Sequence, residues 1–112
     1  MPSVIDQHLI DNATPLPPNG RVQSHVIDVR GAQYVAVNVS IPSNDPNVWR
    51  TIYFGPTTNN AFTPLRRDNF GSNNNMSTFA PVCGPNLMVI VENFGTQQTT
   101  CDGTVYAVRQ VP

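Results

Sequence analysis

The sequence predicts an all-β fold: a single domain over residues 1–112, built as a β-sandwich of seven to eight short strands, with jelly-roll topology favoured and a barrel as the alternative. Three observations support this prediction. The 11 prolines and 7 glycines are spread along the chain and leave little room for a long helix. Between them lie short segments in which residues alternate between two faces. Clusters of Asn, Asp, Gly and Pro, which are typical of turns, separate these segments.

The clearest strand is Tyr34–Ile41, in which every second residue is a valine or isoleucine and which Pro42 ends. The segment Leu87–Val91 is apolar throughout, and this pattern is typical of a central strand. We therefore expect the core to contain Val35, Val37, Val39, Ile41, Leu87, Val89 and Val91.

The remaining strands are predicted by the same reasoning. They are Val4–Ile10, Val22–Val29, Trp49–Phe54, Ser77–Val82 and Thr104–Val111. The Arg30-Gly31-Ala32 turn predicts that Val22–Val29 forms a hairpin with Tyr34–Ile41. The polar stretch Thr57–Asn75 reads as a long loop, held to the core by Phe62, Leu65 and Phe70.

Charged side chains are scarce and unusual in kind. The 13 charged residues include six arginines but no lysine, and Glu92 is the only glutamate, whereas asparagine occurs 13 times and threonine 10 times. Lysine and glutamate protect exposed sheet edges and are depleted where surfaces are buried against partners. This composition therefore predicts a chain that works within an assembly. A net charge of −1 argues against nucleic acid or an anionic membrane as a partner.

Cys83 and Cys101 are the only cysteines, so one disulfide and two free thiols are both open. Direct hairpin pairing of the last two strands would set Cys101 nearer Asn93 than Cys83, which favours free thiols. His8 and His25 show no metal-ligand spacing relative to the cysteines, so we expect no metal.

Catalytic patterns are not evident. Most carboxylates lie beside Asn, Gly or Pro, where aspartate commonly caps turns. Ser24 and His25 are adjacent in a predicted strand and therefore point to opposite faces, so they do not form a dyad. We expect a protein without enzymatic activity and without a cofactor.

Two sets of residues are candidates for binding. Arg66 and Arg67, followed by Asp68, are expected to form ion pairs within the chain or with a neighbouring subunit, and arginine is favoured at interfaces. The asparagine run Asn73, Asn74 and Asn75 completes this candidate interface. Trp49 and Tyr53 are the candidates for stacking on a carbohydrate in an alternative interpretation, and Tyr34 and Tyr106 are further aromatic residues for such a platform.

Three segments resemble the small jelly-roll decoration or cement proteins of tailed-phage heads: Val26–Ala32, the alternating strand after it, and Pro81–Phe94 running into Thr104–Arg109. The resemblance implies a structural role in a virion, with trimers that bind a major capsid or shell protein and stabilise it. The alternative is an extracellular carbohydrate-binding or adhesion module. That function would require an exposed row of aromatic side chains or a loop that holds Ca²⁺.

Overall fold

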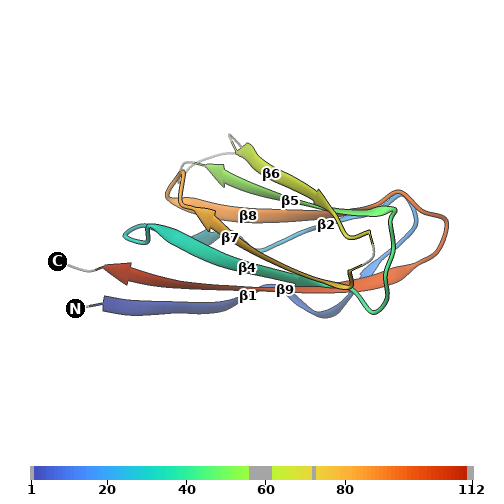
Figure 1. Ribbon diagram of the computed structural model, residues 1–112, viewed down its shortest axis with the longest axis horizontal. Helices are drawn as coiled ribbons and strands as arrows, with labels where there is room; N and C mark the ends of the chain where they lie inside the picture. The colour runs from blue at the N-terminus through green and yellow to red at the C-terminus, as the bar shows by residue number, and fades with distance from the viewer. Residues whose placement is uncertain (1, 56–61, 72, 111–112) are drawn as a thin grey trace.

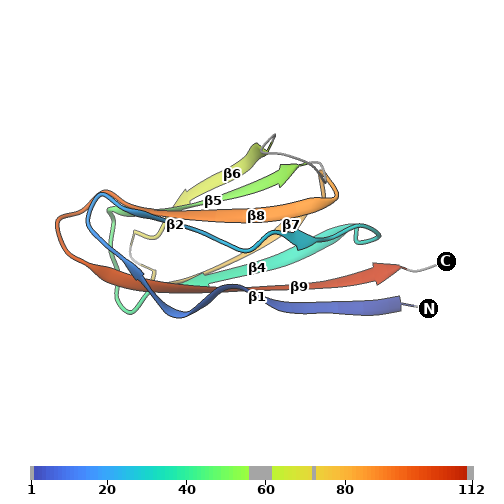
Figure 2. The same ribbon diagram turned by 180° about the vertical axis from the view of Figure 1, so that it is seen from behind.

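The computed structural model describes residues 2–55, 62–71 and 73–110. Two antiparallel sheets pack face to face (Figures 1 and 2). The strands are β1 (Pro2–Leu16), β2 (Arg21–Gln23), β3 (Ile27–Asp28), β4 (Tyr34–Ser40), β5 (Val48–Gly55), β6 (Thr63–Asn69), β7 (Asn75–Pro81), β8 (Asn86–Asn93) and β9 (Thr99–Gln110). Within the described ranges, no helix is long and apolar enough to cross a membrane.

The strand order confirms the predicted jelly roll. One sheet has the order β1-β9-β4-β7 and the other β2-β8-β5-β6, with β3 also paired to β8. The antiparallel pairs are nested along the chain: β1 with β9, β2 and β3 with β8, β4 with β7, and β5 with β6. Counting β2 and β3 as one interrupted strand gives the eight strands of a jelly roll.

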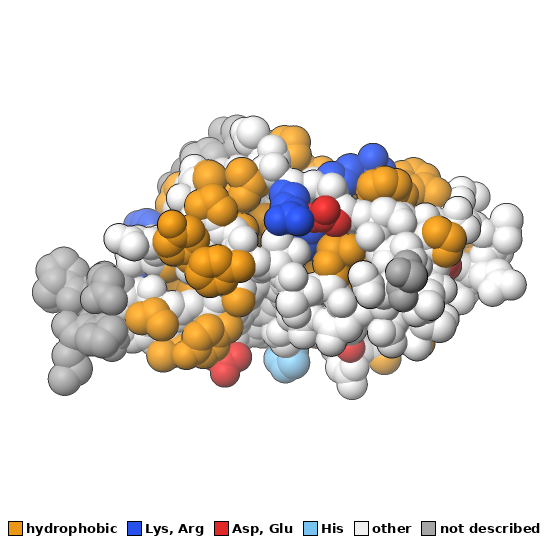
Figure 3. Space-filling model, viewed as in Figure 1, with side chains coloured by type: hydrophobic (Ala, Val, Ile, Leu, Met, Phe, Trp, Pro, Cys, Tyr) orange, Lys and Arg blue, Asp and Glu red, His pale blue; other side chains and the backbone are white. Residues whose placement is uncertain are grey.

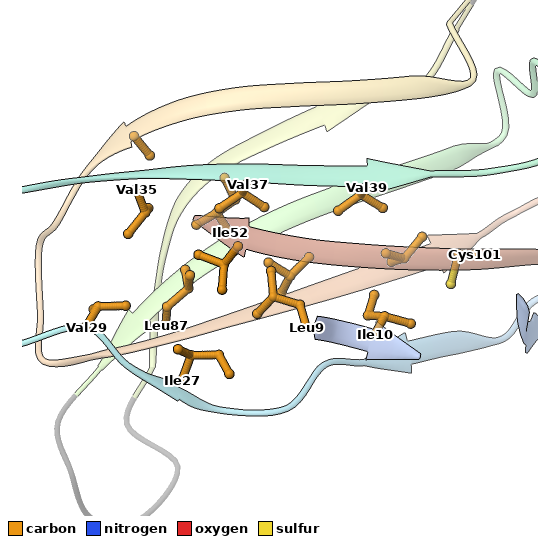
Figure 4. Packing of buried hydrophobic residues seen from close by; sticks show 14 of the residues in the cluster. Leu9, Ile10, Ile27, Val29, Val35, Val37, Val39, Ile52, Leu87 and Cys101 are labelled. Carbon is orange, nitrogen blue, oxygen red and sulfur yellow. The ribbon is translucent and has the colours of Figure 1, made fainter. Parts of the chain in front are cut away.

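The predicted core residues are all buried between the two sheets. On β4 the valines at 35, 37 and 39 have no exposed surface, while the residues between them point outward, as the alternation predicted. Figure 4 shows Val35, Val37 and Val39 lining the inside of one sheet, with Ile52 and Leu87 from the other sheet facing them. The strand β8 is central as expected, because it pairs with β5 on one side and with β2 and β3 on the other.

The predicted hairpin between Val22–Val29 and Tyr34–Ile41 is wrong. β2 and β3 pair with β8, whereas β4 pairs with β7 and β9 in the opposite sheet. The turn itself is present, with Gly31 in the left-handed region at a φ of 86°. The chain crosses between sheets there because Ile27 and Val29 bury their side chains in the core.

The expected loop at Thr57–Asn75 is wrong over its middle part, Thr63–Asn69. β6 lies there as the edge strand beside β5, and it is held by backbone pairing, since most of its side chains are exposed. Phe70 is buried as predicted and Phe62 is half-buried, but Leu65 is exposed and is not a core anchor. Residues 57–61 of the expected loop lie outside the described ranges.

The two terminal strands extend further than predicted. β1 continues past Ile10 to Leu16 and follows β9 through two register shifts, with Ala13 in the left-handed region at a φ of 58°. β9 begins at Thr99, five residues before the expected start at Thr104, and Val111 lies outside the described ranges. Pairing of Pro2 with Gln110 brings both ends of the chain to one end of the sandwich (Figure 1).

Candidate interaction surfaces

The outer side of the β1-β9-β4-β7 sheet carries a set of exposed apolar side chains that we call the aromatic face. Its members are Val4, Tyr34, Phe79, Tyr106 and Val108. Figure 3 shows apolar side chains gathered at the left of the view, over the end of the sandwich where β4 begins and β7 and β9 end. Four strands of one sheet contribute, so the surface depends on the fold and not on a local motif.

Strand register brings these side chains together. Ala36 on β4 is directly opposite Phe79 on β7 and directly opposite Tyr106 on β9, so a small residue lies between two rings. The Tyr34 and Phe79 rings stack with centroids 5.0 Å apart and planes 13° apart. An open groove of about 500 Å³ runs over Ala36 and reaches Gln33 and Val108.

The aromatic face is similar in size to the largest apolar patch on a typical monomer. The exposed fractions of Tyr34, Phe79 and Tyr106 are 49%, 70% and 50%. Given about 150–250 Å² for a fully exposed aromatic side chain, the three rings alone expose roughly 350 Å². Patches of this size on a monomer are often functional, and they mark sites of contact with other molecules.

A polar row adjoins the aromatic face on the same outer surface. The cross-strand set at the next outward-facing position contains His8, Thr104, Asn38 and Ser77. The Ser77 hydroxyl and the Asn38 amide oxygen are 3.4 Å apart. The outer surface of this sheet thus has an aromatic half and a polar half, and it carries the charged side chains of Asp6, opposite Tyr106, and Asp102, opposite Ser40.

Arg50 is a buried cation inside the sandwich, and sequence reasoning missed it. Its side chain has no exposed surface and occupies an inward position of β5 between Val48 and Ile52. The guanidinium donates from Nη1 to Thr78 Oγ1 on β7 at 2.6 Å and from Nη2 to Asp68 Oδ2 on β6. This arginine therefore ties together the edge strands of the two sheets.

The protonation of Arg50 depends on opposing effects. Burial lowers the pKa of Arg50 and Arg66 lowers it further, while the Asp68 carboxylate raises it. Arg50 Nε is buried and has no hydrogen-bond partner among the described residues. The Asp68 carboxylate is thus the main group that compensates the buried positive charge of Arg50. Arg66 Nε also donates to this carboxylate, at 2.7 Å.

The predicted interface residues lie on different elements. Arg66 and Arg67 are exposed on β6, so they belong to a strand and not to the expected loop. Asn73, Asn74 and Asn75 are exposed in the β6–β7 connection and at the first residue of β7, in the other sheet. The expected internal ion pair is present between Arg66 and Asp68.

Trp49 and Tyr53 are half-buried on the outer side of the other sheet. The Arg67 guanidinium carbon lies 4.4 Å from the centroid of the Trp49 ring and 5.8 Å from that of Phe94. This cation–π contact covers the face of the indole that a sugar would use. Of the four candidate aromatics, Tyr34 and Tyr106 are therefore the exposed ones, and they lie on the other sheet from Trp49 and Tyr53.

Ser24 and His25 have structural partners. Ser24 is buried, its hydroxyl accepts from Val89 N and donates to the His25 carbonyl, and the exposed His25 side chain lies 3.5 Å from Asp11. Ser24 and His25 lie between β2 and β3, and one side chain is buried while the other is exposed, so they point to different sides. Among the described residues, no group of three or more His, Cys, Asp and Glu side chains is arranged to hold a metal.

Cys83 and Cys101 are free, as predicted, although the pairing assumed in that prediction was wrong. β8 and β9 lie in different sheets, and Cys101 is opposite Thr14 on β1. Burial, with a smaller contribution from Asp102, raises the pKa of the Cys101 thiol to about 12. Cys83 is exposed, with Sγ 3.6 Å from the Pro81 carbonyl oxygen.

Asp28 forms a second charged cluster near the start of β4. It accepts from Arg30 Nη2 at 2.7 Å and from the Arg30 backbone N–H at 3.0 Å. These hydrogen bonds lower the pKa of Asp28 to about 2. Arg109 Nη2 donates to the Asp28 backbone carbonyl at 2.5 Å, which links the end of β9 to the turn before β4.

Comparison with known proteins identifies the fold but no family. No protein-family model and no curated protein sequence matches the chain. A subunit of the Bacillus endospore appendages, a family of disulfide-linked pili, superposes with a TM-score of 0.54 and 12% identity over 99% of this chain and 85% of the other. At this identity the likeness shows the fold alone.

Two further solved structures share the fold. VP2 in the subviral particle of infectious bursal disease virus has a TM-score of 0.57 and 11% identity over 97% of this chain, which spans 33% of VP2. The C-terminal CBM6 of LamC, a laminarinase of the marine organism Zobellia galactanivorans, has a TM-score of 0.53 and 7% identity, covering 96% of this chain and 100% of the module. The fold is thus compatible with capsid, appendage and carbohydrate-binding proteins.

Proposed function

We propose that this protein is a non-enzymatic structural subunit of a virion or a surface appendage, and that it is held in the assembly through the aromatic face. The observation that carries the proposal is the exposure of Phe79, Tyr34 and Tyr106 on the outside of one sheet. An exposed cluster of aromatic side chains of this kind is typical of the buried centre of a protein interface.

The composition of the chain supports the same proposal. With no lysine and one glutamate, few groups oppose burial of the outer surface against a partner. The five members of the aromatic face are uncharged, but Asp6 on β1 lies directly opposite Tyr106 beside them, and the next row consists of Thr104, Asn38, Ser77 and His8. A contact there would form mainly by apolar burial and hydrogen bonds, with Asp6 as the charged group beside it.

The size of the aromatic face indicates what kind of assembly it serves. Two such faces together offer roughly 700 Å² from their aromatic rings, whereas a stable isolated interface buries about 1,200–2,000 Å². One such contact is therefore too small to hold an isolated dimer firmly. It suits a subunit that makes several contacts at once, as in a shell or a fibre.

Variants of the aromatic face test the proposal. We expect the chain to self-associate at high concentration, or to bind the shell or fibre protein of its assembly. The double variant Phe79→Ser with Tyr106→Ser should weaken that association at least about tenfold, because the loss of two interface aromatics commonly costs more than about 1.4 kcal/mol of binding free energy. Phe94→Ser is the matched control, because Phe94 is 53% exposed but lies outside the aromatic face. Light scattering and sedimentation equilibrium measure the association of the double variant and of the control. Equal association of the double variant and wild type would contradict the proposal.

The second candidate function is binding of a carbohydrate, and the groove over Ala36 favours it. The groove is walled by Phe79 and Tyr106, and Gln33 and two tyrosine hydroxyls supply polar groups. A monomer that binds glycans on an array, and loses this binding on Tyr106→Ser, would replace the structural proposal. Trp49→Ala serves as the control, since Arg67 covers that ring.

A further inference from the structure

The four strand edges of the sandwich are protected unequally against pairing with another chain. Native sheets protect their edges with charge, proline, bulges or short strands. β6 carries Pro64 and three charged residues, and its pairing with β5 contains a register shift. β2 and β3 are only three and two residues long, and β1 contains two register shifts and two aspartates.

β7 has one of these protections only, the proline at its last position. Its seven residues, Asn75–Pro81, include no charged side chain. It pairs with β4 over all seven residues without a register shift. β7 is therefore a regular, uncharged edge strand, and it carries Phe79, the most exposed member of the aromatic face.

The register shows which backbone groups of β7 face outward. The N–H of Val82 donates to the Gln33 carbonyl, and the N–H of Ile41 donates to the Asn74 carbonyl. Since hydrogen-bonded pairs alternate along an antiparallel ladder, the even-numbered residues of β7 bond to β4. The N–H and C=O groups of Asn75, Ser77 and Phe79 therefore point away from the sheet.

We propose that β7 pairs with β7 of a second copy of this chain, antiparallel and across a two-fold axis at Ser77. The two β1-β9-β4-β7 sheets would then form one continuous sheet of eight strands. This inference rests on the proposed function and names the partner at one contact of the assembly. A two-fold contact alone yields a dimer, so the trimer expected from the sequence would need a separate contact.

Hydrogen bonding favours this register over one centred on Phe79. With the axis at Ser77, Ser77 faces Ser77 of the second copy and Asn75 faces Phe79, so three pairs exchange about six hydrogen bonds. With the axis at Phe79 instead, Ser77 would face Pro81, which has no N–H to donate. The arrangement centred on Ser77 satisfies every outward N–H of β7.

The neighbouring edge limits the contact to β7. Arg50 bonds both Asp68 on β6 and Thr78 on β7, so the two edge strands lie on the same side of the sandwich. Pairing through β7 therefore brings the two β6 edges toward each other. Each β6 carries two arginines and one aspartate, and this excess of positive charge opposes a second pairing there.

Substitutions at Ser77 test the pairing in the full-length chain. Ser77→Pro removes an outward N–H without touching the ladder to β4, and edge strands tolerate proline at such a position. We expect at least about tenfold weaker dimerisation, since two hydrogen bonds are lost across the axis. Ser77→Thr, which keeps the N–H, is the control and should dimerise like wild type. Circular dichroism checks that both variants are folded.

Charge exchange at Ser77 tests the two-fold axis itself. Ser77→Lys and Ser77→Asp should each dimerise several-fold more weakly than wild type, because like charges face each other directly. A mixture of the two variants should recover dimers, each with one lysine and one aspartate. Recovery is expected only if residue 77 of one chain lies opposite residue 77 of the next.

Crosslinking fixes the register. In a Cys83→Ser background, Ser77→Cys places two thiols on Cα atoms about 5.5 Å apart, within the 4.4–6.8 Å that a disulfide needs. We expect a covalent dimer on mild oxidation, detected as a doubled mass without reductant. Asn75→Cys in the same background should not crosslink, because the two copies of residue 75 would be at least about 13 Å apart along the strands.

The outcomes separate this inference from the proposed function. If Ser77→Pro associates like wild type, or Asn75→Cys crosslinks as readily as Ser77→Cys, the β7 pairing is wrong. If association is then lost in Phe79→Ser with Tyr106→Ser, the structural function still holds. Polymers in place of dimers would also overturn the two-fold pairing, since head-to-tail contacts produce open fibres.

Discussion

Substitutions at Asp68 and Arg50 should have unequal effects on stability, although the two residues form one ion pair. Asp68→Asn leaves the Arg50 charge inside the sandwich, with no exposed surface and with Nε already unpaired. Removing one partner of a buried ion pair typically costs about 3–5 kcal/mol. Arg50→Met instead removes the buried charge and fills its volume. The remaining carboxylate is 31% exposed and keeps its hydrogen bond from Arg66.

We therefore expect Asp68→Asn to lower the free energy of unfolding by about 3 kcal/mol or more, and Arg50→Met to lower it by about 1 kcal/mol or less. The double variant should resemble Arg50→Met, because no charge is then stranded. Urea unfolding followed by the fluorescence of Trp49, the only tryptophan, measures all three. Ser43→Ala, on an exposed turn, is a control for substitutions without partners.

A larger loss for Arg50→Met than for Asp68→Asn would refute this reasoning. It would mean that the hydrogen bond from Arg50 on β5 to Thr78 on β7 contributes more to stability than the compensation of a buried charge. Additive effects in the double variant would point the same way, since two independent contributions would then be lost.

Three further predictions follow from the burial of single groups. Cys83 is exposed and should react with a thiol reagent at pH 8 within minutes. Cys101, whose pKa is raised to about 12 by burial, should react only on unfolding, and rapid modification of both cysteines in the native protein would contradict this. Asp28→Asn should cost about 1 kcal/mol or less near neutral pH, because the group is partly exposed. The pKa of Asp28 in the folded protein, about 2, is below the ordinary 3.8, so its contribution to stability is present above pH 3.8 and should vanish as the pH falls toward 2. If Asp28→Asn lowered the free energy of unfolding by the same amount at pH 2, Arg30 would not be holding the carboxylate. Val89→Asp should abolish folding, since Val89 is fully buried on the central strand β8, and a folded, cooperative variant would show that strand to be misassigned.

The strands that could be predicted are those whose sequence shows the burial pattern directly. Tyr34–Ile41 alternates because β4 has one buried side, and Leu87–Val91 is continuous because β8 is covered on both. β6 could not be predicted in this way. It contains Pro64, Arg66 and Arg67, has little burial and owes its place to backbone pairing with β5.

Long-range partners were less accessible to sequence reasoning than the strands themselves. The turn at Gly31 is equally consistent with a hairpin and with a crossing between sheets, and only the pairing of β3 with β8 distinguishes them. The jelly-roll class was nevertheless predictable, because it depends on the number and spacing of the strands.

The candidate surface was predicted only in part. Tyr34 and Tyr106 were recognised as candidate aromatics, but they are 72 positions apart and become neighbours of Phe79 only through the registers of β4 with β7 and β9. Phe79 carried no separate signal, since β7 alternates without a clear apolar side. Arg50 was missed because a cation at an inward strand position contradicts the usual pattern.

The salt dependence of self-association tests the central claim most directly. The molecular mass of the wild-type chain is measured by sedimentation equilibrium over a wide concentration range, once in dilute buffer and once in 1 M NaCl. A subunit held chiefly by apolar burial at the aromatic face and by backbone pairing of β7 should exceed the 12.3 kDa of the monomer as concentration rises, and to about the same extent in high salt. A mass of 12.3 kDa at every concentration, with no affinity for a shell or fibre protein, would contradict the claim that this chain is a structural subunit.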